Sequence, residues 1–175
     1  MAALTIAGSA ARSAPVDPLQ ATLIDQAGHR FSFAQLRGAP VAVTFVATRC
    51  KDECPMVNAW FMKIQGQLRR KHVGATLLTL TLDPQYDTPR VMAAEGRVLG
   101  ADPRVWRFAS GSVPSVDAIL AAFRVHPQRD EHGIPDIHTT FVYILNARGK
   151  VADIELPSAN IVEDTIAALQ AQSRS

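Results

Sequence analysis

The feature that most constrains the fold of this chain is an apolar run that leads directly into a cysteine pair. Val41–Val46 is a continuous run of apolar and β-branched residues, as expected of a strand covered on both faces. Cys50 and Cys54, the only two cysteines in the sequence, follow at once, and Pro55 suits the first turn of a helix. The pair is therefore predicted at a strand-to-helix junction, where ligands bind in open α/β sheets.

The rest of the chain alternates between strand-like and helix-like patterns. Strands are predicted at Thr76–Leu82, around Trp106 and Phe108, at Phe141–Leu145 and at Val151–Leu156, and helices at Pro55–Gly74, Thr88–Leu99, Ser115–Phe123 and Ile161–Gln170. The polar, turn-rich stretch His126–Asp136 is predicted to be a loop. Alternation favours parallel β-α-β pairing, and a turn at Asn146–Gly149 adds a closing antiparallel hairpin. This order is that of an α/β thioredoxin-like fold, with a central mixed sheet flanked by helices.

Length and charge set the domain organisation. At 175 residues the chain fits one domain, expected over residues 16–175. Residues 1–15 are small and apolar, and are interpreted as the remnant of an export signal or anchor, or as a disordered tail. The formal net charge is +2, and the cluster Arg69–Lys71 is interpreted as a solvated helix end rather than a nucleic-acid site. No apolar run approaches the roughly 20 residues that span a bilayer, so membrane attachment is expected only through an unseen N-terminal anchor.

The spacing of the two cysteines indicates redox or metal chemistry. Cysteines four residues apart on a forming helical turn lie on the same side, where the two sulfurs can oxidise together or bind one metal ion. The partial positive charge of a helix N-terminus favours the thiolate form. The alternative is a pair of ordinary buried cysteines, but the polar stretch Arg49–Cys54 argues against it.

His138 is the predicted third member of the site because it stands just before the strand Phe141–Leu145. In thioredoxin-like folds the loop that enters this strand faces the dithiol. Two thiolates and one imidazole suit Cu(I), and the imidazole allows Cu(II) as well, whereas Zn²⁺ would require a fourth ligand. The alternative is a polar residue that caps the strand. No role is assigned to the other histidines, His29, His72, His126 and His132.

Three sequence blocks together resemble the Sco/SenC family over roughly residues 15–170. They are Thr48-x-Cys50-x3-Cys54-Pro55, then Leu82-Asp83-Pro84-x3-Asp87-Thr88-Pro89, then His138-Thr139 ahead of Phe141-Val142-Tyr143. The family often has Asp directly before the histidine, whereas here Ile137 occupies that place and Asp136 lies one residue further back. The segment Lys51–Glu53 is also more charged than is usual in the family.

The resemblance implies a thioredoxin-fold, copper-binding metallochaperone that takes part in the assembly of cytochrome c oxidase. Such proteins deliver copper to the dinuclear copper A centre, or reduce its cysteines, and are usually anchored to the bacterial inner membrane facing the periplasm. Copper, as Cu(I) or Cu(II), would be held by Cys50, Cys54 and His138. The implied partner is the oxidase subunit with the copper A site, or another copper chaperone. Asp83 matches a family Asp and is interpreted as a helix cap, with a position near the site as the alternative.

Whether the protein is an enzyme stays open, with the chaperone favoured. The alternative is a thiol-disulfide oxidoreductase, in which the more exposed Cys50 attacks a disulfide and Cys54 resolves the mixed disulfide. Such an oxidoreductase normally has a cis-proline where His138 stands, which favours copper. A peroxiredoxin-like peroxidase is disfavoured, because Thr48 precedes Cys50 by two residues and the peroxidatic pattern T-x-x-C needs three.

Overall fold

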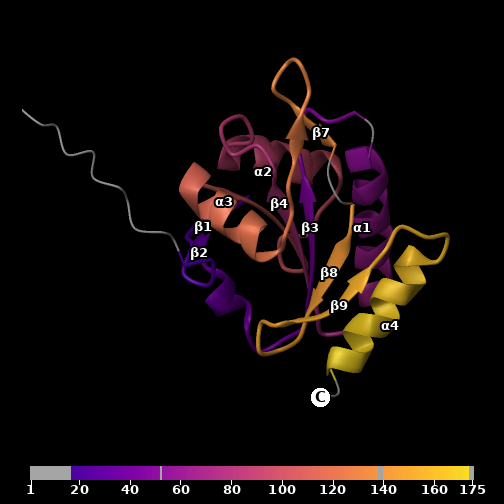
Figure 1. Ribbon diagram of the computed structural model, residues 1–175. Helices are drawn as coiled ribbons and strands as arrows, with labels where there is room; N and C mark the ends of the chain where they lie inside the picture. Colours follow the sequence, from indigo (N-terminus) through magenta and orange to yellow (C-terminus); the bar gives the residue numbers. More distant parts are fainter. Residues whose placement is uncertain (1–16, 52, 138–139, 174–175) are drawn as a thin grey trace, which may run out of the picture.

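The fold is built on a seven-stranded mixed sheet in a computed structural model that describes residues 17–51, 53–137 and 140–173. The strand order is β2-β1-β5-β4-β3-β8-β9 (Figure 1). The main-sheet strands are β1 (Leu23–Asp25), β2 (Arg30–Phe31), β3 (Val41–Val46), β4 (Thr76–Thr81), β5 (Trp106–Gly111), β8 (Val142–Leu145) and β9 (Val151–Glu155). The helices are α1 (Glu53–Arg70), α2 (Pro89–Val98), α3 (Val113–Ala122) and α4 (Ile161–Ser173), with a short 3₁₀ helix, η1, at Phe33–Leu36.

The central strand confirms the sequence prediction, since all six residues of β3 are buried. Strand β3 pairs in parallel with β4, and β4 pairs in parallel with β5. The closing hairpin is antiparallel, with β8 between β3 and β9. Because Val46 lies opposite Thr81 in the parallel pair, the loops that follow β3 and β4 emerge at the same edge of the sheet.

Aromatic side chains fill the space between the sheet and the helices in two groups. Phe45 on β3 packs edge-on against Phe123, the C-terminal cap of α3, with ring centroids 5.3 Å apart. In the second group, Trp106 on β5 contacts Phe61 of α1 at 5.7 Å and Phe108 at 4.8 Å. Figure 1 shows α3 in front of the sheet with α2 behind it. Apolar residues on both faces of the sheet therefore fix the strands whose ends bear the cysteine loop.

The region predicted as a loop at His126–Asp136 contains a hairpin, so that prediction is wrong in part. Strands β6 (Gln128–Arg129) and β7 (Pro135–Ile137) form a separate two-stranded sheet. The carboxylate of Asp130 accepts hydrogen bonds from the backbone N–H groups of His132 and Ile134, at 2.9 and 2.7 Å. Local bonds of this kind organise a polar turn without an apolar pattern. The hairpin projects at the top of Figure 1.

Further expectations concern the basic end of helix α1, membrane attachment and the N-terminal segment. Helix α1 ends at Arg70, and Arg69 binds Asp102 at 2.6 Å, which agrees with a solvated basic helix end. Within the described residues, no helix combines the length and apolar character needed to cross a bilayer. The N-terminal segment 1–15 and the candidate ligand His138 lie outside the described residues.

Candidate dithiol site

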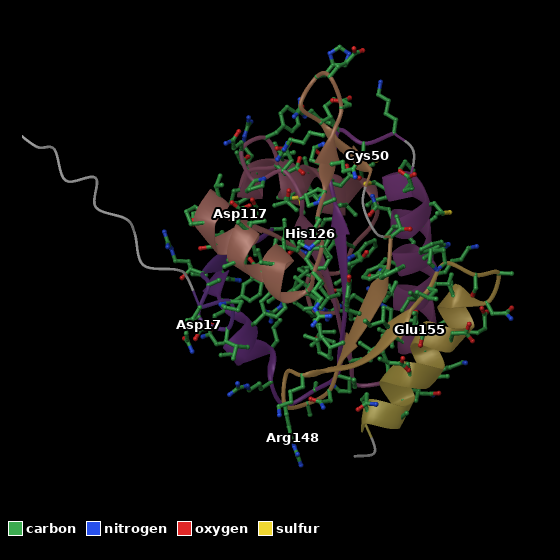
Figure 2. All side chains as sticks on the ribbon, viewed as in Figure 1. Asp17, Cys50, Asp117, His126, Arg148 and Glu155 are labelled. Atoms are coloured by element: carbon green, nitrogen blue, oxygen red, sulfur yellow. The ribbon has the colours of Figure 1, made fainter. Side chains whose placement is uncertain are left out.

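The two cysteines lie where β3 gives way to α1, as predicted. Helix α1 begins at Glu53, two residues before the predicted start, so Cys54 belongs to its first turn. The backbone N–H of Cys50 donates to the carbonyl of Ala47 at 3.0 Å, which folds the loop back onto the end of β3. Ala47 in turn directs its own N–H at Sγ of Cys54, at 3.4 Å. Figure 2 labels Cys50 near the end of the molecule at which the β6–β7 hairpin projects.

Both cysteines are reduced thiols, and both are buried. Cys50 is 6% exposed and Cys54 is 2% exposed. The predicted order of exposure is therefore confirmed, although the difference between the two residues is small. The two thiols are thus buried although Lys51 between them is exposed and Arg49 and Glu53 are only partly buried.

The pKa of Cys54 contradicts the expectation that the helix start favours its thiolate. Burial raises this pKa well above its ordinary value, and a hydrogen bond with the Cys50 thiol raises it further. The N–H of Ala47 stabilises the thiolate and acts in the opposite direction, but with the smaller effect. Desolvation thus dominates, and Cys54 is held as a neutral thiol.

A cavity of about 200 Å³ lies beside the thiols, between α1 and α2. It is lined by Ala47, Thr48, Cys50, Cys54, Pro55, Asn58, Glu95 and Leu99. Asn58 Nδ2 donates to Glu95 Oε1 at 3.1 Å, while the buried Oδ1 of Asn58 has no hydrogen-bond partner within the described part of the chain. Burial raises the pKa of Glu95, and the charge of Asp87 adds to this effect. Sequence reasoning missed Asn58 and Glu95. For Asn58 a signal was present, because it follows Cys54 by four residues and therefore lies on the same helix face.

Asp87, from the loop after β4, fixes the start of the cysteine loop. It is fully buried and accepts hydrogen bonds from the Thr48 backbone N–H at 3.1 Å and from the Thr81 hydroxyl at 2.8 Å. The Thr48 hydroxyl donates to its other carboxylate oxygen. Burial raises the pKa of Asp87, and these hydrogen bonds oppose the rise. Asp87 of the second sequence block is thus hydrogen-bonded directly to Thr48 of the first block.

Asp83 does not cap a helix, so the favoured sequence interpretation is wrong. The cap of α2 is Thr88, whose hydroxyl accepts from the N–H of Val91 at 3.4 Å. Asp83 instead binds Nη2 of Arg49 at 2.7 Å and Nη1 of Arg129 at 3.2 Å. The alternative interpretation, a group placed near the site, is the one that the geometry supports.

Of the three predicted metal ligands, the described residues include the two sulfur donors, Cys50 and Cys54. Among the residues in ranges 17–51, 53–137 and 140–173, no three His, Cys, Asp or Glu side chains gather closely enough to hold a metal ion. The third predicted ligand, His138, lies outside these ranges. The side chains of His29 and His132, to which no role is assigned, are 78% and 73% exposed.

Comparison with known proteins assigns the chain to a family. The SCO1/SenC family model matches residues 19–172, which includes both cysteines and both aspartates of the site. The chain belongs to the SCO1/SenC family. This confirms the resemblance that the three sequence blocks indicate.

Relatives of this SCO1/SenC protein resemble it in sequence or in fold. The SCO1 protein homolog of Bacillus subtilis (strain 168) is 26% identical over 148 residues, 82% of this chain and 74% of that protein. The structure of Bradyrhizobium japonicum ScoI with copper bound has a TM-score of 0.74 at 20% identity, over 86% of this chain and 96% of that chain. The structure of BsSco, a member of the Sco family of cytochrome c oxidase assembly proteins with a disulfide switch, has a TM-score of 0.76 at 22% identity, over 87% and 91%. The predicted thioredoxin-like fold is confirmed.

Proposed function

We propose that this SCO1/SenC protein binds copper as its cargo through the thiolates of Cys50 and Cys54 and the imidazole of His138, and delivers it to a copper A centre. The observation that carries the proposal is that both thiols line one small cavity at the edge of the sheet. Thiolates are soft ligands that select Cu(I), and imidazole suits either oxidation state of copper. The Bradyrhizobium relative of the same fold holds copper, which supports the same cargo here.

Loading such a site requires the loss of a proton. Because burial raises the pKa of Cys54, this residue meets the metal as a thiol and must release its proton when the sulfur coordinates. Cys50 is the less buried of the two and is the sulfur that an incoming partner meets first. Copper transfer by ligand exchange would then pass through Cys50.

The proposed partner is the oxidase subunit that carries the copper A site, with another copper chaperone as the source of the metal. BsSco belongs to a family of cytochrome c oxidase assembly proteins, and family membership supports the same pathway for this chain. We place the protein on the periplasmic side of the bacterial inner membrane, where a copper A domain would be accessible to it.

Anaerobic titration of Cu(I) into the reduced protein against a competing chelator tests the proposal. We expect one copper per chain, and affinity lowered at least about tenfold in Cys50→Ser, Cys54→Ser and His138→Ala. His126→Ala, at an exposed histidine, is the matched control and should bind as the wild type does. Unchanged affinity in Cys54→Ser would contradict the dithiol site, and unchanged affinity in His138→Ala would remove the histidine from it.

A thiol-disulfide oxidoreductase is the second candidate, and the unequal burial of the two thiols favours it. Cys50 as thiolate would attack a partner disulfide, forming a mixed disulfide and releasing one partner thiolate. Cys54, once deprotonated, would attack the Cys50 sulfur, release the second partner thiolate and leave a Cys50–Cys54 disulfide, so that two electrons pass to the partner. In this case Cys54→Ser should trap the mixed disulfide, and His138→Ala should reduce the partner at the wild-type rate.

A further inference from the structure

A single buried carboxylate connects the cysteine loop to the β6–β7 hairpin. The side chain of Asp83 is 3% exposed, and each of its oxygens accepts from a different arginine. Arg49, at 2.7 Å, is the residue directly before Cys50, and Arg129, at 3.2 Å, ends strand β6. The guanidinium of Arg49 also lies over the ring of Tyr86, 4.3 Å from its centroid. We call Arg49, Asp83 and Arg129 the Asp83 clasp.

The backbone hydrogen bonds of the β6–β7 hairpin are made within the hairpin itself, so a side chain must connect it to the cysteine loop. Strands β6 and β7 pair only with each other among the described strands. Asp130 donates its N–H to the carbonyl of Ile134 at 2.9 Å, which closes the turn. Arg129 Nη1 donates to the carbonyl of Gly133 at 2.6 Å as well as to Asp83. One guanidinium therefore joins the hairpin turn to the carboxylate that holds the cysteine loop.

We propose that Arg129 is a positioning residue for the dithiol site, acting through the Asp83 clasp. It holds the β6–β7 hairpin against the cysteine loop, which restricts access to Cys50 and fixes β7, the strand whose last residue, Ile137, directly precedes His138 in sequence. The part that concerns copper rests on the proposed function, whereas restricted access to Cys50 does not.

The charge arrangement predicts that Arg129 can be removed without loss of the fold. A buried carboxylate needs a cation, and Asp83 keeps Arg49 when Arg129 is absent. The Arg129 side chain is 43% exposed, so its pairing energy is that of a partly solvated ion pair. Its loss should release the hairpin while the cysteine loop keeps its own tie.

The chain contains a matched control for this test. Asp102 also binds two arginines, Arg69 at 2.6 Å and Arg104 at 2.9 Å, and its side chain is 11% exposed. This pair of contacts joins the end of α1 to the turn before β5 and includes neither the hairpin nor the cysteine loop. Arg104→Gln therefore removes one of two arginines from a carboxylate, as Arg129→Gln does, but at a place away from the thiols.

The test is the rate at which iodoacetamide modifies Cys50 in the reduced, metal-free protein, followed by peptide mass mapping. In Arg129→Gln we expect a rise of about three- to fivefold, the upper range for loss of a partly exposed ion pair. Arg129→Lys, which keeps the charge, should fall between Arg129→Gln and the wild type, and Arg104→Gln should react at the wild-type rate. Adding Arg129→Gln to Asp83→Asn should give no further acceleration.

Two outcomes would overturn the clasp. One is an equal Cys50 rate in Arg129→Gln and the wild type, and the other is an equal acceleration in Arg129→Gln and Arg104→Gln, which would indicate general loosening. Cu(I) affinity, measured in parallel, should fall in Arg129→Gln and stay at the wild-type value in Arg104→Gln. If the wild type binds no Cu(I), the proposed function fails, but the iodoacetamide rates still decide the clasp.

Discussion

Thr48 donates two hydrogen bonds to Asp87, one from its backbone N–H, at 3.1 Å, and one from its hydroxyl group. The two residues are 39 positions apart and belong to the loops that follow β3 and β4. Because β3 and β4 are parallel neighbours, a carboxylate in one loop reaches the start of the other. The position of Cys50, two residues after Thr48, is thus coupled to a buried acid.

Stability should depend on pH through Asp87. Burial raises its pKa above the ordinary 3.8, so the folded state retains this proton to higher pH than the unfolded chain does. Its contribution to stability is therefore fully present below pH 3.8 and is lost as the pH rises through the raised pKa. Asp87→Asn cannot ionise, and its amide oxygen can still accept from Thr48. Relative to this variant, the wild type should lose free energy of unfolding as the pH rises, measured by urea denaturation.

The control for that pH series is Asp117→Asn, at an exposed carboxylate on α3 (Figure 2). Its stability should follow the wild-type pH profile. Parallel profiles for Asp87→Asn and the wild type would contradict the assignment of this dependence to Asp87.

The hydrogen bond between Trp106 and Thr79 should stabilise the core. The indole N–H donates to the Thr79 hydroxyl at 2.9 Å, and both side chains are fully buried. Thr79→Val keeps the shape but leaves the N–H unpaired, which should lower the free energy of unfolding by about 1–3 kcal/mol in urea denaturation. Thr79→Ser, which keeps the hydroxyl, should preserve the bond, and wild-type stability in Thr79→Val would refute its contribution.

The two cysteines should react at different rates. Cys54 is the more buried, and its raised pKa keeps it protonated at pH 8. Iodoacetamide should therefore modify Cys50 at least about tenfold faster in the native, reduced protein, since thiolate is the reactive form. Mass mapping in denaturing urea is the control, where the two rates should converge. Faster modification of Cys54 in the native state would contradict the argument from burial and pKa.

Two helical glycines should respond to alanine in opposite directions. A Cβ at Gly96 would lie 3.1 Å from Cδ2 of Phe108, a fully buried ring, so Gly96→Ala should destabilise by about 1 kcal/mol despite its gain in helix propensity. A Cβ at Gly66 would meet only the flexible guanidinium of Arg70, at 3.3 Å. Gly66→Ala should stabilise by about 0.5–1 kcal/mol. Thermal and urea denaturation of both variants distinguish these signs, and the same sign for both would refute the packing argument.

The strands, the helices and the location of the dithiol could be predicted from the sequence because their signals are local. The run Val41–Val46 coincides with β3, and the predicted helix Thr88–Leu99 differs from α2 by a residue at each end. Periodicity and proline placement report which faces are buried and where helices begin. These local signals were enough to place Cys50 and Cys54 at the junction of β3 and α1.

The environment of the site could not be predicted, because it depends on residues distant in sequence. Arg49 and Arg129 meet at Asp83 although 80 positions separate them. Arg49 occupies an unspecified position of the first sequence block, and Arg129 lies in none of the three blocks. The raised pKa of Cys54 results from the packing around it, which a helix-dipole argument omits. The β6–β7 hairpin was missed because turn hydrogen bonds from Asp130 hold its polar residues.

The parallel pairing of β3 and β4 has a consequence for engineering. The pairing registers Val46 against Thr81, and both loops of the site begin just beyond this fixed edge. Cys50 and Cys54 pack in the core, whereas Lys51 between them is exposed, so the stretch from one cysteine to the other is a natural graft point. Dithiol segments from distant relatives can be exchanged here. The metal affinities and redox potentials of several segments could then be measured on one unchanged sheet.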